Sequence, residues 1–229
     1  MKIALLGYGK MGQLVEKSAH AKGHQIVSRQ LGTLQERKEE LRQADLAIDF
    51  SQASSVLPHL EICLELSKPI VIGTTGWDEY IPVAQEKVIK SKRCCFYAPN
   101  FSLGVYLFQQ IVNYAASLLQ PFEEYDVSGI EYHHREKLDK PSGTAKALMQ
   151  NILKHMPRMD DVHFSSVRCG HMPGTHTVHF DSSLDTLTLT HEARNRQGFA
   201  QGAIAAAEWV LPQQGFFSID EMMQSIYLT

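Results

Sequence analysis

The sequence predicts an α/β protein made of two domains. Strand and helix patterns alternate over roughly the first hundred residues, and a glycine-rich turn follows the first strand directly. After Phe101, apolar and polar residues alternate over longer segments, which indicates longer strands. The first pattern is typical of a parallel sheet covered on both faces, and the second of an antiparallel sheet with one wet face.

Five short apolar segments of the first domain are expected to be strands. They are Lys2–Leu6, Ile26–Val27, Leu46–Phe50, Ile70–Gly73 and Cys94–Ala98. One helix should open at the glycine-rich turn and end near Gly23, and another carries Val56, Leu60 and Leu64 at helical spacing. We therefore expect a doubly wound parallel sheet of the Rossmann type.

The second domain should begin after the Pro99-Asn100-Phe101 corner with an amphipathic helix from about Leu103 to Leu119. Segments such as THTVHFDSS and DTLTLTHEA follow, so we expect an α+β domain with a mixed or antiparallel sheet. A last Ala-rich helix, Ala200–Leu211, is apolar enough to pack back on the first domain. The predicted domains are 1–101 together with 200–229, and 102–199.

Composition restricts the possible partners. The 229 residues carry a formal net charge of −3 and are 44% hydrophobic, as in an ordinary soluble protein. We expect no nucleic-acid partner, because there is no basic excess, and no membrane partner, because no apolar run approaches ~20 residues. The four cysteines lack metal-binding spacing and the N-terminus lacks a leader pattern, so we expect reduced thiols in a cytoplasmic protein.

The turn Gly7-x-Gly9-x-x-Gly12 fits the fingerprint of dinucleotide-binding folds. The glycines would allow a tight turn, close approach of the backbone to a pyrophosphate, and close packing of helix on strand. Free N–H groups at the helix start would then bind the phosphates. A plain glycine-rich turn would show the same letters, but the flanking strand and helix favour a dinucleotide cofactor.

The residue that would select between NADH and NADPH is ambiguous. An acidic residue about 20 residues after the turn normally holds the adenosine ribose of NADH. Here the second strand ends at Ser28-Arg29, and the next acid is Glu36. Arg29 could instead contact the 2′-phosphate of NADPH, which slightly favours NADPH.

Two further loops follow strands of the same predicted sheet. Gly73-Thr74-Thr75 follows the fourth strand and Pro99-Asn100-Phe101 the fifth. Such loops lie at the carboxyl edge of the sheet, where ligands bind, so both could line a nicotinamide pocket. The first could equally be an ordinary turn, and the second a domain hinge.

The stretch EYHHREKLDKPSGTA, residues 131–145, contains the highest concentration of candidate catalytic and ligand-binding residues. Adjacent His133 and His134 on a strand point to opposite faces, so only one can easily face a given site. That geometry, and the lack of a third ligand at zinc-site spacing, lead us to expect no metal. Three charged residues suit a solvated surface: Arg135, Glu136 and Lys140.

The end of this stretch predicts an anion site. Pro141 leads into Ser142-Gly143-Thr144 at a helix start, where free N–H groups, two hydroxyls and a glycine suit a carboxylate or phosphate. His133 and Lys137 lie just upstream, with Asp139 near enough to orient the lysine. An imidazole and an ammonium beside a bound anion suit general-acid catalysis.

The same stretch resembles the signature E-x-H-H-x-x-K-x-D-x-P-S-G-T-A of the dihydrodipicolinate reductase family. Further segments agree in order along essentially the whole chain: KIALLGYGKMG, DFS, VIGTTG, NFSLGV, SVRCGHMPGTH and FAQGAIAAAEW. The resemblance implies NAD(P)H-dependent reduction of 4-hydroxy-tetrahydrodipicolinate in the diaminopimelate route to lysine. It also implies a homotetramer, with a nucleotide-binding domain and a domain for substrate binding and tetramerisation.

The resemblance also implies a role for each matched residue. His133 would be the catalytic acid and Lys137 its partner. The dicarboxylate substrate would be bound by His134, Lys137, Ser142, Gly143 and Thr144. The cofactor pyrophosphate would be cradled by Gly7, Lys10, Met11 and Gly12, and the nicotinamide pocket lined by Gly73, Thr74, Thr75, Pro99, Asn100 and Phe101. Two alternatives stay open: a reductase of another small dicarboxylate, and an NAD(P)H-binding sensor without turnover.

Overall fold

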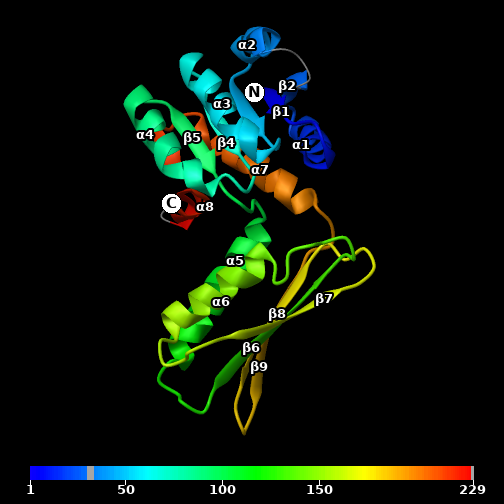
Figure 1. Ribbon diagram of the computed structural model, residues 1–229, viewed down its shortest axis with the longest axis vertical. Helices are drawn as coiled ribbons and strands as arrows, with labels where there is room; N and C mark the ends of the chain where they lie inside the picture. Colours follow the sequence, from blue (N-terminus) through cyan, green and yellow to red (C-terminus); the bar gives the residue numbers. More distant parts are fainter. Residues whose placement is uncertain (30–33, 228–229) are drawn as a thin grey trace. The chain divides into compact units, whose positions relative to one another are not determined.

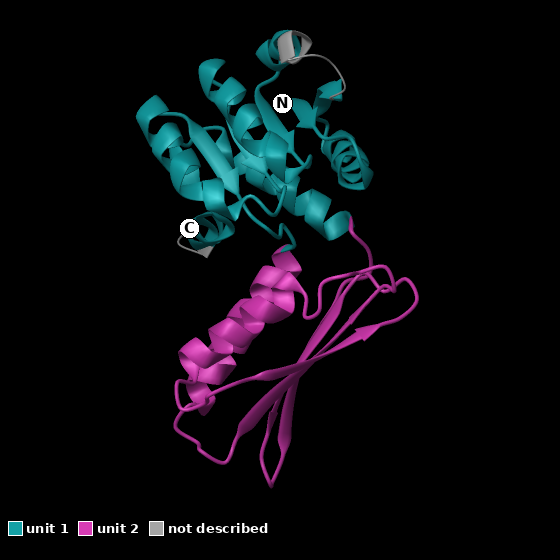
Figure 2. Ribbon diagram, viewed as in Figure 1, with its two compact units in different colours: residues 1–102, 197–229 teal, residues 103–196 magenta. Residues whose placement is uncertain are grey.

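The computed structural model describes residues 1–29 and 34–227 and divides into two compact units (Figure 2). Unit 1 comprises residues 1–102 and 197–229, and unit 2 comprises residues 103–196. Each unit contains a hydrophobic core of its own. Among the described residues, no helix has the length and apolar character needed to span a membrane.

Unit 1 is built on a six-stranded sheet of order β10-β5-β4-β3-β1-β2, in which every pairing is parallel (Figure 1). The strands are β1 (Lys2–Leu6), β2 (Gln25–Arg29), β3 (Leu46–Asp49), β4 (Ile70–Ile72), β5 (Cys94–Tyr97) and β10 (Gly215–Phe217). All residues of β3, β4 and β5 are buried, which explains their continuous apolar character.

Helices cover both faces of this sheet, so the predicted doubly wound fold is confirmed. The helices are α1 (Lys10–Ala21), α2 (Leu34–Gln43), α3 (Ala53–Glu65), the 3-10 helix η1 (Asp78–Tyr80), α4 (Ile81–Ser91), α7 (Gln197–Val210) and α8 (Ile219–Tyr227). Side chains of α2, α3 and α4 share one core with the sheet. Helix α7 packs against α1 and against the central strands.

The C-terminal segment supplies a strand, β10, that the sequence pattern does not predict. β10 pairs in parallel with β5 at the edge of the sheet. Helix α7, just before it, lies so close to the chain at Phe101 that a Cβ on Gly202 would come within 1.8 Å of the Phe101 carbonyl oxygen. At three residues, β10 is too short to show a period, and therefore its pattern was not recognised.

Unit 2 contains a four-stranded sheet of order β7-β6-β8-β9, with helices α5 and α6 along one face (Figure 1). The elements are α5 (Leu103–Leu119), β6 (Asp126–His133), α6 (Gly143–His155), β7 (His163–Arg168), β8 (Thr175–Asp181) and β9 (Thr186–Glu192). β6 and β7 are parallel and the other pairs antiparallel, which confirms the predicted mixed sheet. Val112, Leu148 and Phe180 join the helices to the sheet in one core.

Candidate active site

Strand register in unit 2 gathers four polar side chains near the end of β6. Glu131 pairs with His176 on β8, and His133 pairs with Arg168 on β7. Glu131 and His133 are two residues apart on one strand, so their side chains share a face of the sheet. Glu131 is 0%, His133 7% and His176 4% exposed. A buried carboxylate therefore lies among two imidazoles and a guanidinium.

The two oxygens of Glu131 have different surroundings. Oε1 accepts hydrogen bonds from the Ser142 N–H (2.9 Å), the Ser166 hydroxyl (2.7 Å) and Arg168 Nη2 (2.8 Å). Oε2 lies 3.5 Å from His133 Nδ1 and 3.4 Å from His176 Nε2. Burial opposes ionisation, but contacts with His176, Ser142, Arg168 and Ser166 hold the pKa of this carboxyl far below its usual range. Glu131 is therefore a carboxylate at neutral pH.

His133 is held neutral by its surroundings. Burial is the main cause and the neighbouring His176 the second, and together they lower the pKa of His133 to about 4 although Glu131 opposes them. The two imidazole rings are 5.1 Å apart in an edge-to-face arrangement. An anion placed beside His133 would raise this pKa again, so that the ring could take up a proton and later donate it.

Two cationic side chains and His134 lie in the same part of unit 2. Lys137 Nζ is 2.7 Å from Asp139 Oδ1, the contact expected from their spacing. His134, half-buried just beyond the end of β6, has its Nε2 3.2 Å from Nη2 of Arg196. Arg196 was not among the predicted site residues. It adds a second fixed positive charge that suits a dicarboxylate.

The start of α6 divides into a buried and an open part. Ser142 is buried, and its hydroxyl accepts the Ala145 N–H (3.2 Å) and lies 3.2 Å from His176 Nε2. The polar atoms of Ser142 are therefore engaged within the protein. Gly143, by contrast, is exposed, and a Cβ there would meet nothing within 4 Å. Of the three predicted anion-binding residues, Gly143 and the half-buried Thr144 are more accessible than Ser142.

No third ligand stands near His133 at zinc-site spacing in the sequence, but the fold brings two further candidate ligands close to it. Ligand atoms of Glu131, His133 and His176 all lie within 4.8 Å of one another. His176 comes from a neighbouring strand, and sequence spacing does not reveal such an approach. Arg168 already supplies a positive charge to the Glu131 carboxylate, so the cluster is compensated without a cation. The absence of a metal stays a prediction.

In unit 1, the glycine-rich turn has the properties that a dinucleotide site requires. Gly7 has φ +96°, and a Cβ there would lie 2.3 Å from the Phe50 carbonyl oxygen. A Cβ on Gly12 would lie 2.4 Å from the Gly7 carbonyl oxygen, so this glycine allows α1 to pack closely. A Cβ on Gly9 would meet nothing within 4 Å. Gly9 thus leaves the backbone open where a pyrophosphate must approach.

The first residues of α1 complete this turn. The N-cap residue of α1 is Gly9, which makes no side-chain cap hydrogen bond, and the first N–H groups of a helix have no partner within the helix itself. Lys10 is exposed and Met11 half-buried at the first two helical positions. The residues present therefore fit the phosphates of a dinucleotide.

A second buried carboxylate, Asp49, joins the loops after β3 and β4. Asp49 is 0% exposed. Its Oδ1 accepts the Ser51 N–H (2.9 Å), the Ser51 hydroxyl (2.7 Å) and the Thr74 hydroxyl (2.8 Å). Its Oδ2 is 2.7 Å from His59 Nδ1. Thr74 is therefore occupied in holding the loop, whereas its neighbour Thr75 is exposed.

Phe50 links the remaining predicted nicotinamide residues. Its ring would be only 2.2 Å from a Cβ on Gly73, so the ring lies against that glycine. The Phe50 and Phe101 rings are 5.8 Å apart in an edge-to-face contact. Asn100 Oδ1 accepts the Ser102 N–H (2.8 Å), and Pro99 is exposed. The loops after β1, β3, β4 and β5 thus meet at the carboxyl edge of the sheet, as expected for a ligand crevice.

Arg29, the predicted 2′-phosphate contact, is engaged within the protein. Its Nε donates to Glu16 Oε1 (2.9 Å), and its guanidinium lies 5.9 Å from the centre of the Tyr8 ring. The Tyr8 hydroxyl also donates to Glu16. The hydrogen bond from Arg29 lowers the pKa of Glu16, so the pair is ionised and its charges cancel locally. Residues 30–33, which follow Arg29, lie outside the described part of the chain.

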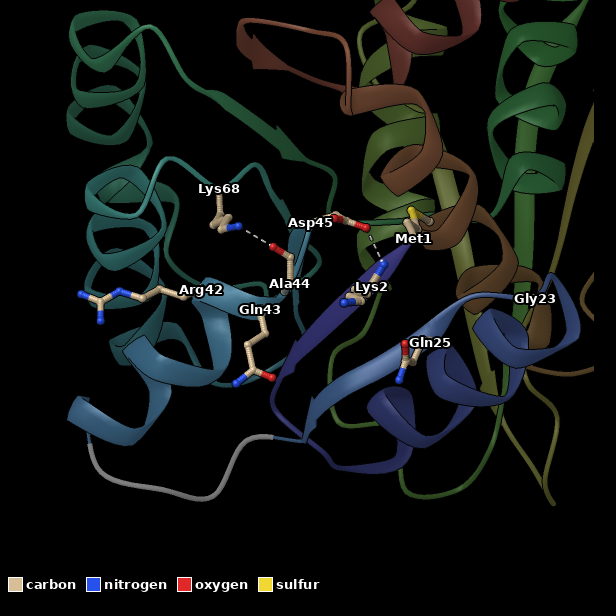
Figure 3. A pocket seen from close by; sticks show the side chains of 9 residues that line it. All are labelled: Met1, Lys2, Gly23, Gln25, Arg42, Gln43, Ala44, Asp45 and Lys68. Carbon is tan, nitrogen blue, oxygen red and sulfur yellow. Dashed lines mark hydrogen bonds between the residues drawn. The ribbon is translucent and has the colours of Figure 1, made fainter.

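A pocket of about 360 Å³ lies at the opposite, amino edge of this sheet (Figure 3). Asp45 accepts the Lys2 N–H (2.6 Å) there, and Lys68 Nζ donates to the Ala44 carbonyl (2.6 Å). Ligands of doubly wound sheets bind at the carboxyl edge, so this pocket is not a candidate for the reaction.

Four residues of the candidate active site had no predicted role: Glu131, Arg168, His176 and Arg196. Glu131, Arg168 and His176 lie in the quoted segments EYHHREKLDKPSGTA and SVRCGHMPGTH. The register that brings them together is not visible in the sequence. A buried acid two residues before His133, on the same face of the strand, was the available signal for Glu131.

Comparisons with known proteins agree along the chain. Residues 1–101 match the family model described as dihydrodipicolinate reductase, N-terminus, and residues 104–223 match the model described as dihydrodipicolinate reductase, C-terminus. A protein of Christiangramia forsetii named 4-hydroxy-tetrahydrodipicolinate reductase is 37% identical, covering 99% of this chain and 99% of its own. A protein of the same name from Staphylococcus haemolyticus is 35% identical over 97% of this chain and 100% of its own.

A solved structure supports the fold. The dipicolinate-bound dihydrodipicolinate reductase from Paenisporosarcina sp. TG-14 superposes with a TM-score of 0.82 at 24% identity, covering 96% of this chain and 98% of that one. Together, the two family models and the full-length relatives show that the chain belongs to the dihydrodipicolinate reductase family.

Proposed function

We propose that the protein reduces 4-hydroxy-tetrahydrodipicolinate to tetrahydrodipicolinate, in the diaminopimelate route to lysine. The observation that carries the proposal is the buried His133–Glu131 pair of unit 2, which lies near Lys137 and the open start of α6. A reduced nicotinamide held at the carboxyl edge of unit 1 would supply the hydride. The reaction takes up one further proton and releases one water, and His133 would donate that proton.

The residues of unit 2 would bind the substrate by its charge. One carboxylate would accept N–H groups at Gly143 and Thr144, and the other would pair with Lys137, with His134 and Arg196 beside it. A dianion beside His133 would raise the pKa of that imidazole from about 4 toward neutrality. His133 would then carry a proton only when substrate is bound. Ser142 would act by holding the helix start rather than by contacting the substrate.

For the cofactor, we propose that NADPH and NADH both bind, with the pyrophosphate at Gly7, Gly9, Lys10, Met11 and Gly12. The nicotinamide would lie against the loops at Gly73, Thr75 and Pro99–Phe101. The Arg29–Glu16 pair weakens the sequence argument for NADPH, because a 2′-phosphate would have to compete with the Glu16 carboxylate for the guanidinium.

We further propose a homotetramer in the cytoplasm. Half-buried Ile130 and Tyr132 lie on the face of β6 opposite Glu131 and His133, which gives the uncovered face of the unit 2 sheet an apolar component. Free cysteines, including the exposed Cys169, suit a reducing compartment. Light scattering after size-exclusion chromatography should give four times the 25.8 kDa chain mass, and a monomer mass would contradict the tetramer.

The reductase proposal is tested by following NADPH and NADH absorbance with the condensation product of pyruvate and aspartate semialdehyde. Consumption should require that substrate, whereas a sensor would bind the nucleotide without consuming it, and a different reductase would prefer another dicarboxylate. His133→Gln should lower kcat by about 10²–10⁴-fold, because a general acid typically contributes that much. Near-normal turnover in His133→Gln would show that His133 is not the general acid.

A further inference from the structure

Two buried polar atoms of the candidate active site face each other without a hydrogen bond. Glu131 Oε2 and His133 Nδ1 are 3.5 Å apart, and both lack a hydrogen-bond partner among the described residues. Both side chains are more than nine-tenths buried. Unpaired buried polar atoms are costly, so a pair that needs only a small approach to bond calls for an explanation.

The two nitrogens of His133 have different neighbours. Nδ1 faces the Glu131 carboxylate. Nε2 lies beside Gly174, where an added Cβ would come within 3.0 Å of it. Gly174, with φ +153°, therefore keeps room at Nε2 that a side chain would fill. Room for a ligand is therefore left at Nε2, whereas Nδ1 is faced by the carboxylate.

Four titratable or charged side chains act on His133, and they come from three strands and one loop. Glu131 on the same strand favours a protonated ring, whereas His176 on β8, Arg168 on β7 and Lys137 in the following loop disfavour it. Among these groups, Glu131 is the only anion. It is kept ionised by Arg168 and the hydroxyl and N–H donors on its other oxygen.

We infer that Glu131 is a positioning residue: it accepts a hydrogen bond from His133 Nδ1–H and thereby makes Nε2 the nitrogen that gains and donates the proton. This inference rests on the proposed function of His133 as the acid. In the proton transfer, the Nε2–H bond breaks as a bond from that hydrogen to the substrate forms. The ring is left neutral with its proton on Nδ1, which still donates a hydrogen bond to Glu131. Solvent reprotonates Nε2 after the product leaves.

A merely structural Glu131 would act through Oε1 alone, by tying Ser142, Ser166 and Arg168 together. Glu131→Gln separates the two roles. The amide oxygen can keep the three donors, while the amide NH₂ takes the place of Oε2 and donates to Nδ1 instead of accepting from it. The variant should therefore reverse the His133 tautomer to Nε2–H and lower the pKa of the ring.

The test is ¹⁵N-histidine NMR of the purified full chain, with His133→Gln used to assign the His133 signals. Wild type should show the Nδ1–H tautomer, and Glu131→Gln the Nε2–H tautomer, with a titration midpoint below that of wild type. Glu136→Gln removes the same charge from an exposed loop residue and should leave both readouts unchanged. An Nε2–H tautomer in wild type, or an unchanged one in Glu131→Gln, would overturn the inference.

The test depends neither on the folding of one variant nor on the reaction. If Glu131→Gln does not fold, the wild-type spectrum decides by itself, because an Nε2–H tautomer there would show that His133 Nδ1 does not donate to Glu131. In the reductase assay, Glu131→Gln should lose about 10–100-fold in kcat, up to the lower end of the 10²–10⁴-fold that a general acid contributes, with little change in KM. If wild type shows the Nδ1–H tautomer but no turnover, the proposed function fails and the positioning role of Glu131 stands.

Discussion

Asp49 in unit 1 and Glu131 in unit 2 are both buried acids near the carboxyl end of a strand, and each has a histidine neighbour. They differ in how their second oxygen is used. Asp49 Oδ2 makes a 2.7 Å contact with His59 Nδ1, whereas Glu131 Oε2 stays 3.4–3.5 Å from two imidazoles. Both oxygens of Asp49 make hydrogen bonds and fix two loops. One oxygen of Glu131, beside the proposed acid, has no hydrogen-bond partner among the described residues.

The two buried acids therefore use their charge in different ways. A carboxylate whose hydrogen bonds are all made rigidifies its surroundings, and changing it affects mainly stability. A carboxylate with one oxygen unbonded can strengthen an interaction when a neighbour becomes charged. Stability and chemistry should therefore respond differently to mutation at the two acids.

The largest effect is expected at Asp49. Asp49→Ala should lower the free energy of unfolding by about 3–5 kcal/mol, because it leaves His59, Ser51 and Thr74 without their buried partner. Both tryptophans, Trp77 and Trp209, lie in unit 1, so tryptophan fluorescence in urea reports this unit. Asp45→Ala, at an exposed acid, is the matched control and should cost about 1 kcal/mol or less. Equal losses in the two variants would show that Asp49 does not hold the loops together.

The next effect concerns pH. Because the pKa of His133 is about 4 in the folded chain and 6.5 in the reference state, the unfolded chain binds more protons between these values. Stability contributed by neutral His133 is therefore present above about pH 6.5 and lost as pH falls toward 4. Half-buried His191, whose pKa is also lowered, adds a loss of the same sign.

His133→Gln should remove about 1–3 kcal/mol of this acid-induced loss. The measurement is urea unfolding at pH 7 and pH 4.5, followed by far-UV circular dichroism. His163→Gln, at the exposed start of β7, is the control and should behave like wild type. A wild-type stability that does not fall over this window would contradict the buried neutral His133 and with it the contrast to Asp49.

The smallest effect is expected at a third acid, Glu16, which is only partly buried and pairs with Arg29. Glu16→Gln frees the guanidinium, so affinity for NADPH should rise by about 3–10-fold relative to NADH, the size of a modest surface charge interaction. Fluorescence titration with both nucleotides measures the ratio. Glu86→Gln, on the exposed side of α4, should leave it unchanged. An unchanged ratio in Glu16→Gln would show that Arg29 does not reach the cofactor.

Much of the fold was predictable because its signals are local. Each of the five N-terminal strands contains a short apolar run, and α5 begins and ends at the predicted Leu103 and Leu119 because its apolar residues keep a helical period. β10 was missed because three residues carry no period. Its place is decided by the open edge of β5 rather than by its own sequence.

The candidate site was predictable only where its residues are neighbours in the chain. One stretch of sequence contains His133, Lys137 and the start of α6, so their residue types and spacing indicate an acid beside an anion site. Arg168 and His176 reach Glu131 from two other strands, so their contact depends on register, which one sequence does not reveal. The engagement of Arg29 by Glu16 was likewise hidden, because a helix and a strand bring the two together.

The late strand β10 has a consequence for the order in which the molecule is completed. During synthesis, the first 102 residues leave the ribosome with the outer edge of β5 unpaired and the surface that α7 will cover still open. Unit 2, a continuous stretch of chain, has all its strands and both its helices before α7 is made. Unit 2 can therefore fold first. The six-stranded sheet of unit 1 is completed last, when α7 and β10 have been synthesised.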